Sequence, residues 1–188
     1  MHTALRAAMA AGAIAFALTP RLAAGDDAAG RPAAASFRRV ETQRYTIEVP
    51  EGWEVGEETP FGQRELLPAQ AERAGGGSMS TMTGPGLGRQ SWADLYRTSN
   101  YFITRYSAEG QKMKPGPFRV GKTAQGYASC SWSMSTADGA TVQRHVILKR
   151  ADTDILALSV KLPAATDRDR RSQIEARFRH MVDTAVMR

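Results

Sequence analysis

The chain has 188 residues, of which 42% are hydrophobic and 23% charged, and its formal net charge is +6. This composition is typical of globular proteins and excludes disordered and collagen-like chains. One cysteine, Cys130, and three histidines exclude zinc fingers, iron–sulfur sites and disulfide frameworks by number alone. Because a chain of this length can bury a large core without such supports, we expect neither a cofactor nor a metal.

The first 24 residues have the organisation of a secretory signal peptide. A short basic start at 1–6 precedes a 12-residue apolar run at 7–18, and the sequence Leu-Ala-Ala at 22–24 offers a small-residue cleavage site. Since crossing a bilayer takes about 20 apolar residues, this run is not a transmembrane span. We therefore predict an exported protein, periplasmic or extracellular. Residues 25–36 lack an apolar period and are expected to form a flexible tether.

Residues 37–188 are expected to form one α+β domain that begins with strands. Within 44–49, apolar and polar residues alternate, which predicts a half-buried strand that the turn sequence Pro-Glu-Gly at 50–52 ends. Shorter strands are predicted at 53–55, 61–67 and 78–83, the last two on either side of a glycine-rich loop.

The clearest helix is predicted to start at Ser91. Ser91 and Asp94 have the spacing of a capping box, and the apolar residues that follow recur at helical intervals on one face. These residues are Trp92, Leu95, Tyr96, Phe102, Ile103 and Tyr106. We expect this face to pack on another part of the chain.

A second amphipathic helix is predicted after Pro163, with Thr166 and Asp169 at capping-box spacing. One stripe of this helix is apolar and consists of Ile174, Phe178, Met181, Val182 and Ala185. The basic residues of the helix are Arg168, Arg170, Arg171, Arg177 and Arg179. A charged helix face of this kind is usually solvated, and it also permits weak contact with an anionic surface.

Between 118 and 162 the pattern is that of antiparallel strands joined by hairpins. The sequence Ala-Asp-Gly at 137–139 suits a three-residue loop. If that loop pairs Thr136 with Ala140, Cys130 lies beside Val146 and Trp132 beside Arg144. Arg144 then either stacks on the indole ring of Trp132 or meets an acid from elsewhere in the chain.

A second hairpin, through 151–153, places Leu156 beside Leu148 and Val160 beside Arg144. Together the two registers gather apolar side chains on one face of the sheet, whereas a slip of one residue would scatter them over both faces. The predicted fold is therefore an antiparallel sheet meander flanked by two helices, an α+β arrangement.

The opposite face of this meander carries the candidate ligand-binding residues Tyr127, Ser131, His145 and Ser159. The expected register lines up Ser131, His145 and Ser159 across three adjacent strands, and such a row can bind a polar ligand. The alternative interpretation is a solvated or helix-covered face with short polar side chains, which antiparallel sheets often have. No acid on that face is placed to orient the imidazole, so we predict no catalytic residue.

Two other patterns are rejected as sites. Residues 116–123 match the eight-position P-loop signature, but the surrounding pattern is strand on both sides, and the chemistry needs a helix after the loop. Cys130 and His145 suggest a nucleophile and its base, but the expected register puts them on opposite faces. We therefore predict that Cys130 is a buried, inert thiol.

Residues 45–53, Tyr-Thr-Ile-Glu-Val-Pro-Glu-Gly-Trp, and the order of elements after them resemble the superfamily that includes the PsbP extrinsic subunit of photosystem II and DcrB-like bacterial envelope proteins. The likeness spans about 37–186. It implies an antiparallel sheet with helices on its faces, with Trp53 as a core anchor and Pro50 and Gly52 as turn formers. It also implies binding or stabilising other proteins without catalysis.

Two functional hypotheses follow. The first is an exported, non-catalytic binding or accessory protein that acts through contacts with an unknown protein partner in the cell envelope, and not with nucleic acid. The alternative is a small-ligand carrier or enzyme that uses the polar sheet face around Tyr127, Ser131, His145 and Ser159.

Overall fold

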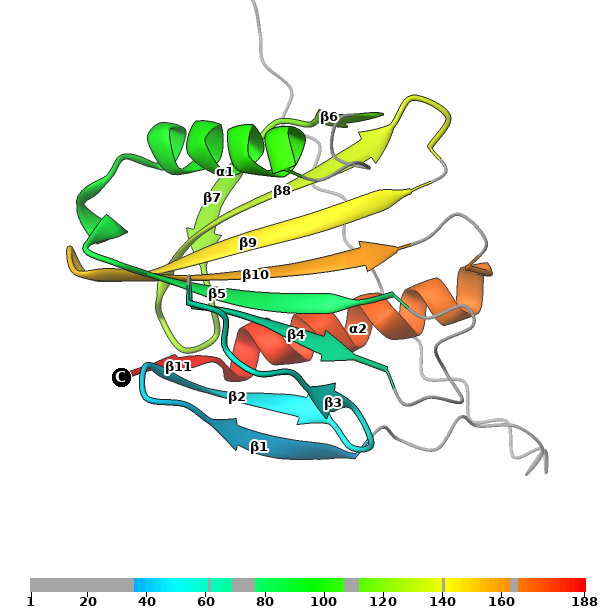
Figure 1. Ribbon diagram of the computed structural model, residues 1–188, viewed down its shortest axis with the longest axis horizontal. Helices are drawn as coiled ribbons and strands as arrows, with labels where there is room; N and C mark the ends of the chain where they lie inside the picture. Colours follow the sequence, from blue (N-terminus) through cyan, green and yellow to red (C-terminus); the bar gives the residue numbers. More distant parts are fainter. Residues whose placement is uncertain (1–35, 61, 69–76, 107–111, 140, 163–165) are drawn as a thin grey trace, which may run out of the picture. The chain divides into compact units, whose positions relative to one another are not determined.

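The computed structural model describes residues 36–60, 62–68, 77–106, 112–139, 141–162 and 166–188. Within them, the strands form two antiparallel sheets, one of three strands and one of eight (Figure 1). The predicted signal peptide, and all of the predicted tether except Ser36, lie outside the described residues.

The larger sheet contains the predicted meander. Its strands run in the order β3-β4-β5-β10-β9-β8-β6, and β7 also pairs with β8. The bounds are β3 (Glu54–Val55), β4 (Gln63–Leu67), β5 (Met79–Pro85), β6 (Met113–Pro115), β7 (Arg119–Lys122), β8 (Ala128–Thr136), β9 (Val142–Arg150) and β10 (Asp154–Leu162).

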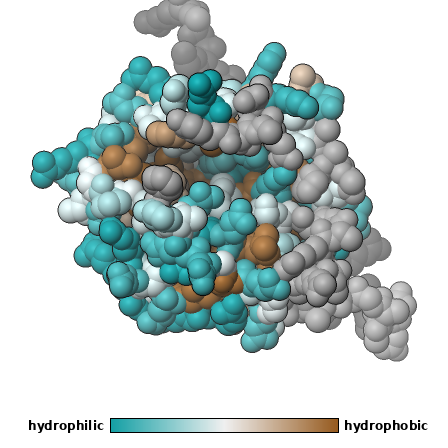
Figure 2. All heavy atoms as spheres, viewed as in Figure 1, coloured by the Kyte–Doolittle hydropathy of each residue, from teal (hydrophilic) through white to brown (hydrophobic). Residues whose placement is uncertain are grey.

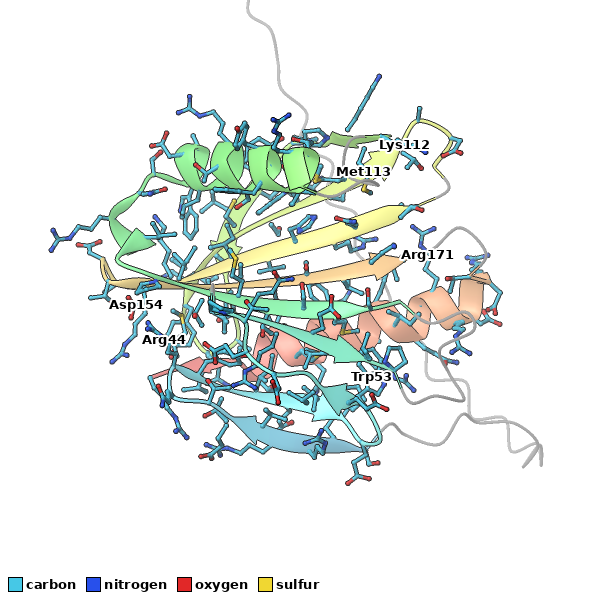
Figure 3. The ribbon with its side chains drawn as sticks, viewed as in Figure 1. Arg44, Trp53, Lys112, Met113, Asp154 and Arg171 are labelled. Atoms are coloured by element: carbon cyan, nitrogen blue, oxygen red, sulfur yellow. The ribbon has the colours of Figure 1, made fainter. Side chains whose placement is uncertain are left out.

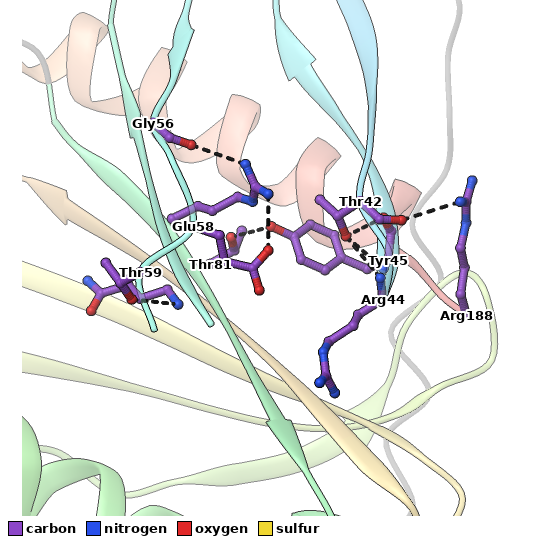
Figure 4. Close-up of polar contacts among 10 residues, drawn as sticks. Thr42, Arg44, Tyr45, Gly56, Glu58, Thr59, Thr81 and Arg188 are labelled. Atoms are coloured by element: carbon purple, nitrogen blue, oxygen red, sulfur yellow. Dashed lines mark hydrogen bonds and ion pairs between the residues drawn. The ribbon is translucent and has the colours of Figure 1, made fainter. Parts of the chain in front are cut away.

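The smaller sheet joins the two ends of the described chain. β2 (Tyr45–Pro50) lies between β1 (Phe37–Glu41) and β11 (Val186–Met187). Strand β11 was not predicted, because its two residues are too few to show a period. The hydroxyl of Tyr45 on β2 lies 2.6 Å from the Thr81 hydroxyl of β5, and this contact links the smaller sheet to the larger one (Figure 4).

The turn after β2 has the predicted construction. Gly52 takes a left-handed φ of 77°, which glycine adopts without steric cost, and the N–H of Trp53 donates to the Pro50 carbonyl over 3.2 Å. The Trp53 side chain is 3% exposed and belongs to the core on the α2 side of the sheet (Figure 3). The Pro-x-Gly-Trp sequence is therefore a turn followed by a core anchor, as expected.

Helix α1 (Trp92–Tyr106) follows a short 3-10 turn, η2 (Leu87–Arg89), and starts as the capping box predicts. The Ser91 hydroxyl accepts the N–H of Asp94 over 3.1 Å and donates to its carboxylate over 2.6 Å. This hydroxyl and the nearby Arg97 guanidinium lower the pKa of Asp94. None of the helices in the described part of the chain is long and apolar enough to cross a membrane.

Helix α2 (Arg168–Thr184) begins one residue later than predicted. The N-cap is Asp167, whose carboxylate accepts the N–H of Arg170 over 2.8 Å. The expectation that Thr166 caps the helix is wrong, because the adjacent Asp167 supplies an equally suitable capping oxygen. The apolar stripe is as predicted, with Ile174, Phe178 and Met181 buried.

Both faces of the larger sheet are covered. On one face α1 contributes Leu95 to a core that includes Cys130, Trp132, Met134 and Ile147. On the other face α2 and β2 pack on Leu148, Leu156, Leu158, Val160 and Leu162. Figure 1 shows α1 beside β8 and α2 behind the sheet. The fold is therefore the predicted α+β arrangement of an antiparallel sheet flanked by helices.

The predicted register of the first hairpin is wrong by one residue. Thr136 donates its N–H to the carbonyl of Thr141, and its hydroxyl accepts the N–H of Thr141 over 3.0 Å. These bonds close a four-residue loop, so Cys130 pairs with Ile147 and Trp132 with His145. The second hairpin has the predicted register, with Leu156 opposite Leu148 and Val160 opposite Arg144.

Candidate functional site

The corrected register divides the four candidate ligand-binding residues between the two faces of the sheet. Ser131 pairs with Val146 and lies on the α2 side. Tyr127 lies on the same side, where its hydroxyl accepts the N–H of Met187 over 3.1 Å. His145 and Ser159 pair with each other on the α1 side. The structure therefore brings His145 and Ser159 together but not the predicted set of four.

A longer polar row crosses the α1 side instead. Successive strand partners place Glu65 beside Ser80, Ser80 beside Ser159, Ser159 beside His145, and His145 beside Trp132. Paired residues in antiparallel strands point to the same face, so these side chains form one row over β4, β5, β10, β9 and β8. The hydroxyls of Ser80 and Ser159 lie 2.7 Å apart.

Sequence reasoning missed Glu65 and Ser80 for a topological reason. β5 pairs with β10 although 68 residues lie between Pro85, the last residue of β5, and its strand partner Asp154. No hairpin connects the two strands. Only the alternation within 78–83 was available as a signal, and alternation alone gives no register.

His145 is the most deeply buried polar member of the row. Its side chain is 8% exposed, and its ring stacks on that of Trp132 with centroids 5.0 Å apart and an interplanar angle of 21°. Burial lowers the pKa of His145 to about 4, so the imidazole is neutral at pH 7. Its Nε2 atom is buried and has no hydrogen-bond partner among the described residues. A neutral imidazole nitrogen in this position can make one hydrogen bond to a small polar group.

Two side chains of helix α1 contact the Trp132 ring and fix its position. The indole Nε1 donates to the Asn100 side-chain oxygen over 3.0 Å, and the Tyr96 ring stands edge-on to it with centroids 5.5 Å apart. The hydroxyl of Tyr96 in turn donates to the Gly116 carbonyl over 2.7 Å. The Trp132 end of the polar row is therefore rigidly fixed.

The expected separation of Cys130 and His145 by the sheet is wrong, because the one-residue shift puts both on the α1 side. The two side chains nevertheless make no hydrogen bond with each other. Cys130 is 0% exposed, and burial raises the pKa of its thiol, which keeps the thiol protonated. These observations agree with a buried, unreactive thiol.

The segment that matches the P-loop signature is not a phosphate-binding loop. Residues 119–122 form β7, and a turn leads from there directly into β8, where a P-loop has a helix. The described residues contain no group of three histidine, cysteine, aspartate or glutamate side chains that could hold a metal.

Of the two expectations for Arg144, the second is confirmed: its side chain meets an acid from elsewhere in the chain. The guanidinium donates to Glu175 of α2 over 2.8 and 3.2 Å.

The outer face of α1 carries a pair of exposed aromatic side chains. Tyr101 is 58% and Phe102 53% exposed, and their rings meet edge to face with centroids 5.7 Å apart. In the view of Figure 2, hydrophilic residues cover most of the coloured surface, and hydrophobic residues form separate patches between them. Two large aromatic side chains exposed side by side form an apolar patch on α1.

Comparison with known proteins gives a likeness of structure and not of sequence. No family model and no curated protein matches the chain. The chain is similar to cyanobacterial PsbP (CyanoP) from Synechocystis sp. PCC 6803, with a TM-score of 0.56 and 13% identity over 88% of this chain and 98% of that one. The chain has the PsbP-like fold.

Weaker likenesses to this PsbP-like fold are found in two other solved structures. PA94 from Pseudomonas aeruginosa, a protein of unknown function and putative regulator, gives a TM-score of 0.44 and 12% identity over 81% of this chain and 97% of that one. LpqN of Mycobacterium tuberculosis, which is involved in cell envelope biogenesis, gives a TM-score of 0.43 and 8% identity over 81% of this chain and 90% of that one.

Proposed function

We propose that this chain is an exported, non-catalytic accessory protein of the cell envelope that acts by binding another protein. The observation that carries the proposal is the aromatic pair Tyr101 and Phe102, both more than half exposed on α1. Aromatic side chains are enriched in protein interfaces and often supply most of the binding energy. Exposed together on one helix, they form a surface that gains from being covered.

Export is supported by the signal-peptide pattern of residues 1–24. An additional weak contact with an anionic surface through α2 also belongs to the proposal. On that helix, Glu175 contacts Arg171 over 3.7 Å and also pairs with Arg144 of β9 over 2.8 Å. Arg168 and Arg179 remain exposed, so the surface of α2 keeps basic groups that can face anionic headgroups.

The test is native mass spectrometry of the protein isolated gently from the cells that make it. We expect a discrete protein to remain bound to the wild-type chain and to be lost from Tyr101→Ser, while Gln173→Ser, an exposed position on α2, retains it. Both changes are at exposed positions and should alter stability by less than about 0.5 kcal/mol. Retention of the same partner by Tyr101→Ser would contradict a role for the aromatic pair.

A second candidate function, a small-ligand carrier, is favoured by one observation. The buried Nε2 of His145 lacks a hydrogen-bond partner among the described residues, and buried polar atoms of this kind are normally satisfied. A small polar molecule at the row of Ser80, Ser159 and His145 would supply the missing bond. In the same mass spectra, a bound small molecule that His145→Leu loses would favour this function over the first.

A further inference from the structure

The line formed by β6 and β7 is an edge of the larger sheet. Both strands pair with β8, and neither has a second strand partner among the described residues. All four residues of β7 are exposed, and Val120 is 57% exposed. Met113, the first residue of β6, and Lys112 just before it lie beside the end of α1 (Figure 3). An exposed edge of this kind presents unpaired backbone groups to solvent.

The outward-pointing backbone groups on β7 belong to Val120 and Lys122. Opposed residues in an antiparallel pair alternate between those that exchange backbone hydrogen bonds and those that do not. Thr123, just after β7, donates its N–H to the carbonyl of Tyr127 over 3.0 Å. Because hydrogen-bonded positions recur at every second residue, Gly121 and Arg119 are the residues of β7 whose backbone groups bond to β8. The N–H and C=O groups of the even-numbered residues therefore point away from β8.

The charge along this edge has one sign. Residues 112–136, which include β6, β7 and β8, contain four basic residues and no aspartate or glutamate. The basic residues are Lys112, Lys114, Arg119 and Lys122, all exposed. None of them makes an ion pair with another described residue. A chain that adds to this edge therefore meets positive charge along its whole length.

We propose that β7 binds an acidic, extended segment of a partner protein as an added strand. The backbone of Val120 and Lys122 would supply the hydrogen bonds, Arg119 would attract acidic side chains on one face of the added strand, and Lys122 adds positive charge to the edge. The apolar side chain of Val120 favours an apolar neighbour beside it. The inference rests on the proposed protein-binding function and gives the chemistry of the segment that is bound.

A second copy of this chain is a poor occupant for the edge. Two β7 edges placed side by side would bring two sets of basic side chains together, and like charges on neighbouring strands are destabilising. The same charges protect the free edge from aggregation. They are therefore compatible with an edge that stays open until an acidic segment arrives.

The probe for the test is a fluorescently labelled peptide in which glutamate and valine alternate over ten residues. Fluorescence anisotropy measures its binding to the purified protein at low ionic strength. We expect this peptide to bind. The matched peptide of alternating lysine and valine should bind at least about tenfold more weakly. Failure of the glutamate peptide to bind would overturn the proposal.

The decisive variant is Val120→Pro, which removes an outward N–H without removing a bond to β8. We expect it to lower the affinity about tenfold, the effect of losing one hydrogen bond of roughly 1.4 kcal/mol. The control Val120→Ala keeps the N–H and should bind almost as the wild type does. Equal affinity of Val120→Pro and wild type would overturn strand addition and leave attraction by charge alone, as to an anionic surface.

A measurement on the wild-type protein covers the case in which Val120→Pro does not fold. In amide hydrogen exchange followed by NMR, the peptide should slow exchange at Val120 and Lys122 and leave the amides of strand β1 unchanged. Unchanged exchange at both β7 amides would overturn the proposal. Since Tyr101→Ser leaves β7 intact, it should bind the peptide normally, so a failure here is distinguishable from a failure of the proposed function.

Discussion

The imidazole of His145 lies nearly parallel to the indole of Trp132, with the ring centroids 5.0 Å apart. Asn100 of α1 holds the indole by accepting its N–H over 3.0 Å, so the histidine ring is packed against a fixed surface. Protonation would place a positive charge in a site from which water is largely excluded. The burial of the imidazole therefore makes the fold sensitive to acid.

Acid should destabilise the protein through His145. Its pKa is about 4 in the native state and near 6.5 in the unfolded chain, so the unfolded chain binds more protons between these pH values. The contribution of neutral His145 to the free energy of unfolding is therefore fully present above pH 6.5. It decreases by about 3 kcal/mol in total as the pH falls towards 4. Urea unfolding at a series of pH values measures this loss.

His145→Leu removes the titrating group and should flatten the stability profile between pH 6.5 and 4. The comparison concerns the slope and not the absolute stability, because leucine also changes the packing against Trp132. The same slope in both proteins would show that His145 does not cause the acid sensitivity.

The thiol of Cys130 should be unreactive in the folded protein. Its side chain is 0% exposed, and burial raises its pKa, so little thiolate is available for attack. We expect an aromatic disulfide reagent to modify it only after denaturation. The matched control is Ser133→Cys in a Cys130→Ala background, because Ser133 lies on the same strand but is exposed. Equally rapid modification at both positions in native buffer would contradict the buried site.

The hydroxyl pair of Tyr45 and Thr81 should contribute measurably to stability (Figure 4). The oxygens are 2.6 Å apart, and the side chains are 2% and 1% exposed. Tyr45→Phe and Thr81→Val should each cost about 1–3 kcal/mol, because each leaves the other hydroxyl buried without its partner. The double variant should cost less than the sum by about 1 kcal/mol. Strict additivity in denaturant unfolding would show that the two hydroxyls are not coupled.

Ala151, in the turn between β9 and β10, has a φ of 46°, a conformation that costs a residue with a Cβ roughly 1–2 kcal/mol. Ala151→Gly should therefore stabilise the protein by about 0.5–1 kcal/mol after the entropy of glycine is subtracted. Ala128→Gly, at an exposed position on β8, should have the opposite sign. A lower melting temperature for Ala151→Gly would contradict the strain at this turn.

The sequence was sufficient to predict the helices, most strands and the register of the second hairpin. It was insufficient for the first hairpin because both faces of the sheet are covered. Strand β9 carries apolar residues towards both helices, Val146 and Leu148 on one side and Ile147 on the other. Either register therefore buries apolar surface, and the hydroxyl of Thr136 decides between them by accepting the N–H of Thr141.

That one-residue difference had a large effect on the candidate site. It moved Ser131 away from His145 and brought in Trp132. Glu65 and Ser80 entered the row only through the pairing of β4 and β5 with β10, which depends on tertiary packing. Helical spacing placed Phe102 on the face of α1 that was expected to pack, and this prediction is wrong, because Phe102 is 53% exposed.

Site-specific photo-crosslinking tests the central claim, that the chain acts by binding a protein through the exposed surface of α1. A benzophenone side chain introduced in place of Tyr101, in the cells that make the protein, reports what lies against this surface, and the same group in place of Gln173 on α2 is the control. We predict one discrete protein adduct from position 101 that is absent from position 173. No adduct from position 101, or the same adducts from both positions, would contradict the account.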